Sequence, residues 1–481
     1  MEYKITVMKN AFYAQSGGVT SVINCSAYGV ISKFKKDFSE ANIYASKNGI
    51  VGLLEGELYD LSKTKKPFEN LLEMPGGIFG SCRYKLPSLD DEIFYKNLFD
   101  QLEKLFIGYF FYNGGNDSAD TCLKVAKAAE KFGYDLKAIA VPKTIDNDLA
   151  VTDNCPGFGS VAKYVAISAK EASLDIKSMC KTSTKVFVLE VMGRHAGWIA
   201  AAGELANNSE ETFVHKILLP EVNFDEGKFL SGIEKDVSEY GYSVIVASEG
   251  LKNMNGELYA ASSETDSFGH SQLGGLAPKI ASLITNKLGL KNHWSVADYL
   301  QRSARHISSL TDIEQAIAVG KAAVKLASEG KSGVMPIIKR TDNDPYKWEI
   351  SEGNLNDIAN EENSVNEVYR DMNFINELDS SSLDFKNLLS NSQINYRDKK
   401  KLILSLINES NVLTEKLMDI LIQNKRVKII GDIASSFIQL YNKHNNIKEA
   451  TIITASPINN ELESEILSMI CLLYTSDAAD E

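Results

Sequence analysis

The chain is poor in cysteine, with six in 481 residues, and no two of them form a CxxC pair. This spacing argues against a disulfide-stapled secreted fold and against the common zinc and redox motifs, so we expect a reduced, cytoplasmic protein. The cysteines are Cys25, Cys82, Cys122, Cys155, Cys180 and Cys471. No apolar run is long enough to span a bilayer, and residues 1–10 lack the basic-then-apolar layout of a signal peptide. We therefore expect no membrane partner.

Positive charge is in deficit, since 51 Lys and Arg stand against 64 Asp and Glu and the formal net charge is −13. A protein of this charge is a poor non-specific binder of nucleic acid, and we expect no nucleic-acid partner. A small phosphorylated substrate is compatible with it, because such a ligand needs only a local basic pocket.

Glycine and proline are almost absent from the last quarter of the chain, where only Gly431 and Pro457 lie beyond residue 353. Before that point, apolar β-rich runs alternate with helical patterns and end in loops. The runs are Leu105–Tyr112, Lys137–Val141, Lys185–Val191 and Tyr242–Ala247. Continuous apolar strands separated by amphipathic helices predict an α/β fold whose parallel sheet is covered on both faces.

From about Asp357 to Ile470 the pattern is helical, as the lack of glycine and proline indicates. We expect helices over Ser364–Leu378, Arg397–Ile407 and Val412–Gln423, and a short strand over Glu449–Ala455. The last residues, 471–481 (CLLYTSDAADE), fit neither part and resemble the translation of a sequencing adapter. We expect them to be a scar that takes no part in the fold.

Two glycine pairs each follow a predicted strand and precede a predicted helix, which is where open parallel sheets bind ligands. In Ser16–Thr20 (SGGVT) the glycines let backbone N–H groups approach an anion, although a plain tight turn explains that loop equally well. In Gly114–Ser118 (GGNDS) the side chains of Asn116 and Asp117 offer oxygen ligands to magnesium. The alternative for that loop is helix N-capping by Asp117 or Ser118.

The segment Pro142–Asp148 (PKTIDND) carries the densest chemistry in the chain. In an extended segment, residues two apart share a face, so Asp146 and Asp148 are expected to project together. One carboxylate can accept a hydroxyl proton, the other can help to hold a metal, and Lys143 can neutralise phosphate charge. The alternative is a solvated Asp/Asn turn, which we consider a poor explanation for so dense a motif.

Three further loops hold polar residues at predicted strand ends or on a helix. Arg194, in Met192–His195 (MGRH), suits a phosphoryl contact, and Glu249 suits sugar hydroxyls, although a lone Glu in a turn is usually just solvated. Tyr299 and Arg302 are three apart and share a helix face that suits a sugar phosphate or ordinary surface packing. The histidines, among them His195 and His270, show no metal spacing and are expected to be structural or exposed.

Taken in order, these loops resemble the phosphofructokinase family over about three-quarters of the chain. The matching segments are SGGVTSVIN, GSCRYKL, GGNDSAD, PKTIDNDL, EVMGRHAGW, ASEG, FGHSQLGG and DYLQRSARH. The resemblance implies a Rossmann-like parallel-sheet fold of two α/β subdomains and phosphoryl transfer to the 1-hydroxyl of fructose 6-phosphate. It also implies catalytic roles for Asp146 as general base, with Lys143 and Arg194. Fructose 6-phosphate would be held by Thr144, Ile145, Asp146, Met192, Gly193, Arg194, Glu249, Tyr299 and Arg302.

Within that family, the resemblance points to the pyrophosphate-dependent subgroup. ATP users carry glycine where this chain has Asp117, whose carboxylate would crowd and repel the α-phosphate of ATP. They also carry a small residue at the position of Lys143, whose ammonium would grip the terminal oxygens of pyrophosphate. Gly18, Arg83, Asp117 and Lys143 would therefore bind the diphosphate.

The chain also departs from the family pattern. Asn116 replaces the usual metal-side aspartate, so Mg²⁺ would be held by Asn116 and Asp148 with one charge fewer. Leu273 stands where ATP users have a sugar-phosphate arginine, and Arg302 is the candidate to compensate.

The tail, residues 361–470, is similar to the delta subunit of the F-type ATP synthase in EENSVNEVYRDMNFINEL, NLLSNSQINYRDKKKLI, QLYNKHNN and EATIITASPI. We expect a catalytic part over 1–358, a delta-like helical part over 359–470 and the scar over 471–481. The join near Ala359 is interpreted as two gene fragments spliced together, with sequence assembly as the favoured origin and a natural fusion as the alternative. The tail is expected to add no catalysis.

The prediction is thus a cytoplasmic, homodimeric enzyme that uses Mg²⁺, pyrophosphate and fructose 6-phosphate. Its rivals are an ATP-dependent 6-phosphofructokinase, a non-catalytic regulatory subunit that binds sugar phosphates, and a stalk component. The retention of Asp146 disfavours the regulatory subunit, since a protein without catalysis needs no base.

Overall fold

The computed structural model describes residues 9–64, 67–265, 271–359, 361–390, 394–407, 414, 417–418, 421–422 and 427–444, with backbone alone over 261–265, 271–273, 361–369 and at a few further tail positions. The chain divides into two compact units, residues 1–360 and 361–481. The predicted strand Glu449–Ala455, the segment 471–481 and His270 lie outside the described residues, as does the side chain of Leu273.

The first unit contains a seven-stranded sheet in the order β13-β12-β5-β4-β1-β2-β3. Its central strands, from β12 to β2, run parallel, whereas β13 and β3 pair antiparallel at the two edges. The strands are β1 (Asn10–Gln15), β2 (Ile43–Ser46), β3 (Leu58–Asp60), β4 (Ile107–Gly114), β5 (Lys137–Pro142), β12 (Val334–Asn343) and β13 (Tyr346–Asn354).

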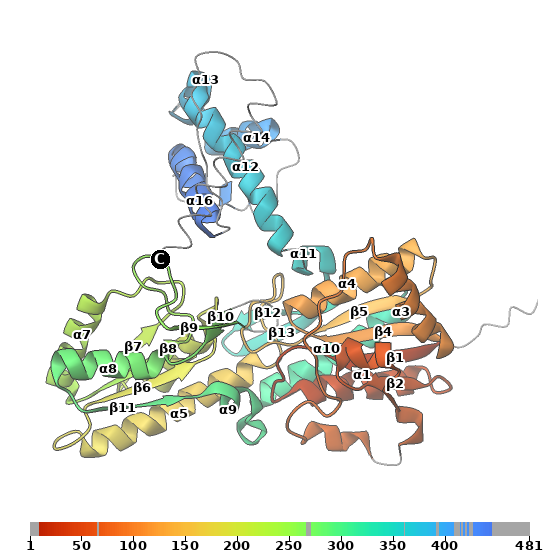
Figure 1. Cartoon of the computed structure of the whole chain (residues 1–481), viewed down its shortest axis with the longest axis horizontal. Coiled ribbons are helices and arrows are strands. Elements are labelled where there is room, and N and C mark those ends of the chain that lie inside the picture. The colour runs from red at the N-terminus through yellow and green to blue at the C-terminus, as the bar shows by residue number, and fades with distance from the viewer. Residues whose placement is uncertain are drawn as a thin grey trace, which may run out of the picture. The chain divides into compact units, whose positions relative to one another are not determined.

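A four-stranded parallel sheet, in the order β11-β6-β8-β7, forms the other half of the first unit. Its strands are β6 (Val186–Val191), β7 (Lys216–Leu218), β8 (Ser243–Ser248) and β11 (Asn292–Val296). A short antiparallel pair, β9 (Ala261–Thr265) and β10 (Ser271–Leu273), lies apart from both sheets in the pairing pattern. Figure 1 shows the larger sheet on the right and the smaller one on the left.

Helices cover both faces of each sheet because alternate strand residues point to opposite sides. In the larger sheet, Phe12 and Phe110 pack with α2, α3, α4 and α11, while Tyr13 and Phe111 pack with α1 and α10. In the smaller sheet, α5 and α6 cover one face and α7 and α8 the other. The helices of this unit are α1 (Ile23–Asp37), α2 (Gly49–Glu55), α3 (Glu92–Lys104), α4 (Asn116–Lys131), α5 (Phe158–Met179), α6 (Trp198–Ala201), α7 (Glu226–Tyr240), α8 (Leu276–Leu288), α9 (Asp298–Ser303), α10 (Leu310–Ser328) and α11 (Leu355–Ala359).

These elements confirm the predicted α/β class with two α/β subdomains. All four predicted strands are present, shifted by one or two residues at their ends, as β4, β5, β6 and β8. Each subdomain has its own main sheet, and the antiparallel edge strands β3 and β13 were not predicted.

Asp312 on α10 joins the two halves at the start of α5. Its buried carboxylate accepts hydrogen bonds from the backbone N–H of Gly157 (2.9 Å) and Ser160 (3.0 Å) and from the Ser160 hydroxyl (2.5 Å). A carboxylate is favoured at a helix N-terminus, where N–H groups lack partners within the helix. Gly157 also forms a parallel bridge with Thr144, so this contact supports the loop that follows β5.

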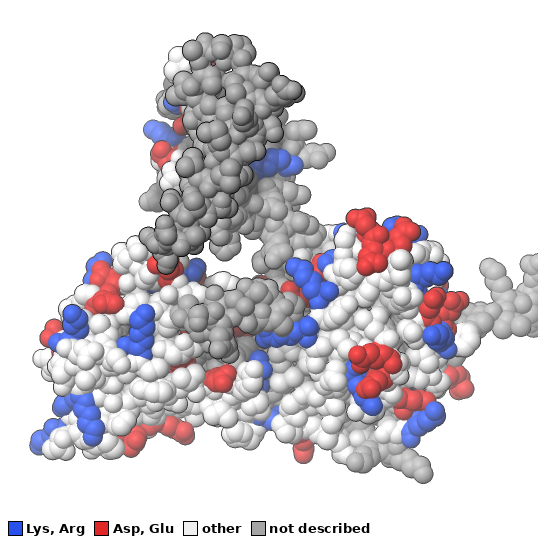
Figure 2. Space-filling view, viewed as in Figure 1, with Lys and Arg blue, Asp and Glu red and all other residues white. Residues whose placement is uncertain are grey.

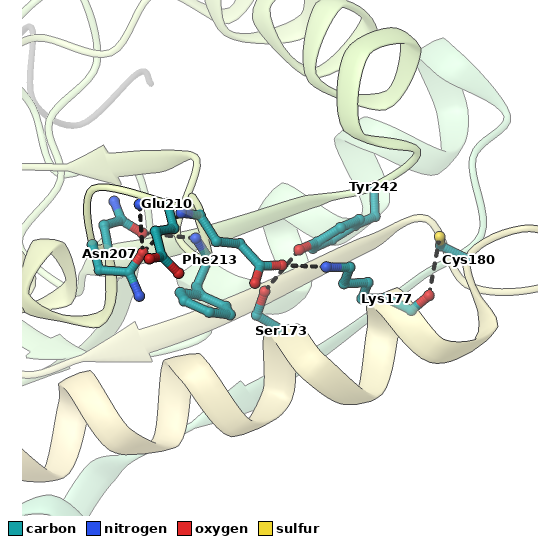
Figure 3. A network of polar contacts seen from close by, with 9 residues as sticks. Ser173, Lys177, Cys180, Asn207, Glu210, Phe213 and Tyr242 are labelled. Carbon is teal, nitrogen blue, oxygen red and sulfur yellow. Dashed lines mark hydrogen bonds and ion pairs between the residues drawn. The ribbon is translucent and has the colours of Figure 1, made fainter.

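The loop between α6 and β7 is fixed to the C-terminal part of α5 (Figure 3). The Asn207 side-chain oxygen accepts hydrogen bonds from the N–H groups of Phe213 and Val214, both at 2.8 Å. Lys177 on α5 forms an ion pair with Glu211, and Ser173 hydrogen-bonds to Tyr242. These contacts therefore hold the loop in one conformation before β7.

The second unit is helical where the structure describes it. Its helices are α12 (Glu361–Ser381), α13 (Leu383–Ser390), α14 (Tyr396–Leu406) and α16 (Ile430–His444). They share a core that includes Met372, Phe385, Ile403 and Ile430. The predicted helix Ser364–Leu378 falls within α12, and Arg397–Ile407 coincides with α14 to within one residue, while Val412–Gln423 is described only in part. Across the described parts of both units, no helix has the length and apolar character needed to cross a bilayer.

Candidate active site

The polar loops predicted from the sequence meet in one cavity of about 380 Å³ at the carboxyl ends of β1, β4, β5, β6 and β8. A second hollow of about 710 Å³ shares much of its lining, including Gly18, Arg83, Arg194, Glu249 and Arg302. Of the predicted site residues, the cavity is lined by Gly18, Arg83, Asn116, Asp117, Lys143, Thr144, Ile145, Asp146, Asp148, Met192, Arg194, Glu249, Tyr299 and Arg302. Gly193 is the one predicted residue outside this lining.

The loop after β5 brings Asp146 and Asp148 to the same cavity by a turn. Asn147 between them has φ +54°, and its side-chain oxygen accepts a hydrogen bond from Cys155 N–H at 2.8 Å. Thr144 Oγ1 accepts another from Asp146 N–H at 3.2 Å. The expectation of an extended segment was therefore wrong, because a left-handed residue held by its own side chain interrupts it.

Lys143 is buried, with 3% of its surface exposed, and its Nζ donates a hydrogen bond to Gly18 O at 2.6 Å. Burial, together with the neighbouring Arg302 and Arg83, lowers the pKa of this ammonium to about 8, against the attraction of Asp146 and Asp148. The Lys143 ammonium is thus charged at neutral pH and lines the cavity. The alternative of a solvated turn does not fit, because the lysine in such a turn would be exposed to water.

Desolvation raises the pKa of three carboxyl groups of the cavity, Asp146, Asp148 and Glu249. Burial raises the pKa of Asp146 to about 6, Asp148 adds repulsion, and Lys143 and Arg302 oppose the rise. Burial likewise raises the pKa of Glu249 to about 7, with repulsion from Asp146 and Glu190. At pH 7 Asp146 is therefore largely ionised and able to accept a proton, whereas Glu249 can either donate or accept one.

The loop after β4 leads straight into α4. The N-cap residue is Gly115, without a side-chain cap, so the alternative that Asp117 or Ser118 caps this helix was wrong. Asn116 Nδ2 donates a hydrogen bond to Asp148 Oδ2 at 3.2 Å. Within the described structure, the buried Asn116 Oδ1 has no hydrogen-bond partner.

Helix α9 supplies Tyr299 and Arg302, which share a face as predicted. The Arg302 guanidinium lies 3.9 Å from the centre of the Tyr299 ring. A Cβ atom on Gly18 would lie 2.7 Å from Arg302 Nη1. The guanidinium thus reaches from the smaller subdomain to the first glycine-rich loop of the larger one.

Sequence reasoning missed several residues at the site. Tyr84 and His195 line the cavity, and His195 is exposed, as one of the two expectations for it had it. Ser248 and Gln301 are buried behind it and bind its backbone. The sequence signal for Ser248 is only its place in the ASEG segment, and that for Gln301 its place between Tyr299 and Arg302.

Comparison with known proteins identifies the families that the two parts of the chain match. The model of the phosphofructokinase family matches residues 10–327, and that of the ATP synthase delta (OSCP) subunit matches residues 354–476.

Two similar proteins are both named pyrophosphate–fructose 6-phosphate 1-phosphotransferase. That of Methylococcus capsulatus is 53% identical over 360 residues, which is 74% of this chain and 86% of the relative. That of Halomonas elongata is 55% identical over 359 residues, or 73% and 85% of the two chains. A crystal structure of a pyrophosphate-dependent phosphofructokinase from Nitrosospira multiformis is similar with a TM-score of 0.67 and 51% identity, covering 74% of this chain and 85% of that one. The chain therefore belongs to the phosphofructokinase family.

Proposed function

We propose that this chain transfers a phosphoryl group from pyrophosphate to the 1-hydroxyl of fructose 6-phosphate, reversibly, in the first unit. The observation that carries the proposal is the cavity that a half-buried Asp146 and a buried Lys143 line together, along with Arg83, Arg194 and Arg302. The names of relatives with more than half of their aligned residues identical support the same reaction.

Asp146 acts as the general base. It takes the proton of the 1-hydroxyl as the sugar oxygen bonds to the nearer phosphorus of pyrophosphate, and the bridging P–O bond breaks to release orthophosphate. Lys143 and Arg83 hold the diphosphate against the backbone at Gly18. Arg194 stabilises the charge on the transferring group.

The sugar phosphate is held on the opposite side of the cavity. The residues that we assign to it are Thr144, Ile145, Met192, Gly193, Arg194, Glu249, Tyr299 and Arg302. Tyr299 and Arg302 are preorganised by their cation–π contact, and a half-buried Glu249 that both donates and accepts suits a sugar hydroxyl.

Pyrophosphate rather than ATP is the donor that the cavity favours. Asp117 lies in the first turn of α4 and lines the cavity, where its carboxylate would repel a nucleotide α-phosphate. Lys143 occupies the cavity from the end of β5 and offers its ammonium to a terminal phosphate.

Magnesium would be held by Asn116 and Asp148. Amide and carboxylate oxygens are ligands that Mg²⁺ prefers, and the unpartnered Asn116 Oδ1 fits such a role. No group of three or more His, Cys, Asp and Glu in the described residues is arranged to hold a metal, which agrees with an ion that takes further ligands from phosphate. Bound there, it would neutralise charge on the diphosphate.

We expect the enzyme to be a homodimer in the cytoplasm, and both statements stay predictions.

Lys, Arg, Asp and Glu are interspersed over the face of the first unit drawn in Figure 2. We assign catalysis to residues 1–358, a delta-like helical segment without catalysis to 359–470, and an adapter-derived scar to 471–481.

Replacing the base tests the mechanism. Asp146→Asn should lower the forward rate by on the order of 10²–10⁴-fold, because the amide cannot accept the hydroxyl proton. Steady-state formation of fructose 1,6-bisphosphate measures it, with Asp100→Asn on the surface of α3 as the control. A D146N enzyme with wild-type turnover would rule out this base.

The pH profile should be bell-shaped. The rate falls as pH drops through about 6, where Asp146 becomes protonated, and falls again as pH rises through about 8, where Lys143 loses its proton. Because phosphate substrates also titrate near pH 6, the residual activity of Asp146→Asn is the control for the acid limb. In D146N that limb should shrink to the part that the substrate phosphates give, and Lys143→Arg should move the alkaline limb upward. Limbs that persist unchanged in these variants contradict the assignments.

Opening the donor pocket should change donor preference. Asp117→Gly combined with Lys143→Gly removes the charge that repels ATP and the ammonium that binds pyrophosphate. The ratio of kcat/KM for ATP to that for pyrophosphate should rise, as measured with saturating fructose 6-phosphate. No gain in this ratio would count against the pocket argument.

A further inference from the structure

Two fully buried polar side chains lie directly behind the sugar side of the cavity. Ser248, the last residue of β8, is 0% exposed, and Gln301 on α9 is 2% exposed. Neither lines the cavity. Burying a hydroxyl and an amide is costly unless both find partners, and the partners of both are backbone atoms of the sugar-side turns.

Ser248 joins the turn of Arg194 to the turn of Glu249. Its Oγ donates a hydrogen bond to Gly193 O at 2.6 Å and accepts one from Gly250 N–H at 3.3 Å. The two turns also touch directly, since a Cβ atom on Gly250 would lie 2.0 Å from the Arg194 carbonyl oxygen. One hydroxyl therefore links the turn that carries Arg194 to the turn that carries Glu249.

The turn needs this support because its backbone is unusual. Gly193 has φ +128°, a conformation that other residues rarely adopt. Glycine has many other conformations open to it, so the strand-end hydrogen bond selects the one that aims Arg194 at the cavity.

Gln301 ties the same turn to α9. Its Oε1 accepts a hydrogen bond from Met192 N–H at 3.3 Å, and its Nε2 donates one to Asp298 O at 3.0 Å. Asp298, which begins α9, has φ +37°, so the amide also holds a strained helix start. The position of Tyr299 and Arg302 is thereby coupled to that of Met192.

We propose that Ser248 and Gln301 are positioning residues that hold the turns 192–194 and 249–250 and the helix 298–303 as one preformed sugar-phosphate site. The inference rests on the proposed function, because it takes fructose 6-phosphate as the ligand of that site. Neither residue itself touches the diphosphate side, where Gly18, Arg83 and Lys143 lie, although Arg302, the neighbour of Gln301, reaches Gly18. Their loss should therefore affect fructose 6-phosphate more than pyrophosphate.

The test compares Ser248→Ala and Gln301→Met with Ser243→Ala. Ser243 is also 0% exposed and lies at the other end of β8, where its hydroxyl donates to Asp236 at 2.8 Å. S243A thus removes a buried hydroxyl from the same strand far from the cavity. Steady-state kinetics with each substrate varied in turn, and a melting curve for each variant, give the comparison.

We expect S248A and Q301M each to raise the KM for fructose 6-phosphate about fivefold or more, the factor that one lost buried hydrogen bond gives. The KM for pyrophosphate should stay within about twofold of wild type. S243A should lower the melting temperature and leave both KM values at the wild-type level. This pattern separates positioning from a general loosening of β8.

Unchanged KM values in S248A and Q301M, an equal rise in the KM of both substrates, or the same rise in S243A would overturn the inference. These outcomes leave the proposed function intact. A wild-type enzyme without turnover of pyrophosphate and fructose 6-phosphate would instead remove the proposed function itself.

Discussion

The site depends on shielding a carboxylate, Asp146, and an ammonium, Lys143, from water in one small cavity. Burial alone would neutralise both Asp146 and Lys143, raising the pKa of the carboxyl and lowering that of the ammonium. Each opposes the shift of the other, so both remain charged near neutral pH while their pKa values move toward it. A proton acceptor and an anion-binding cation thus stand side by side, which phosphoryl transfer to a hydroxyl requires.

The two sheets position the residues of this site. Three strands of the larger sheet bring Gly18, Asn116 and Lys143 to its carboxyl edge, and two strands of the smaller sheet bring Arg194 and Glu249 to the same cavity. Asp312 fastens α10 to the start of α5 between them. In the proposed mechanism the diphosphate residues come from the larger sheet, whereas the sugar residues come from the smaller one, apart from Thr144 and Ile145 in the loop after β5.

Much of this could be predicted from the sequence. Strand ends rich in glycine and charge mark ligand loops, and the order of these loops marks the family, so nearly every expected residue lines the cavity. The reason given for pairing Asp146 with Asp148 was wrong, because the left-handed Asn147 depends on a hydrogen bond to Cys155, eight residues on. The sequence analysis did not predict Ser248 and Gln301, because their hydrogen-bond partners are backbone atoms of other segments, which no local sequence pattern reveals. The predicted boundary of the tail could be drawn from glycine and proline alone, since a helical unit with its own core needs few turns.

Donor choice is the most direct test of the account. Purified full-length protein should be assayed with fructose 6-phosphate and Mg²⁺, with either pyrophosphate or ATP varied, by following fructose 1,6-bisphosphate. We predict turnover with pyrophosphate, and a kcat/KM for ATP far below it. An ATP value equal to or above that for pyrophosphate would contradict the account.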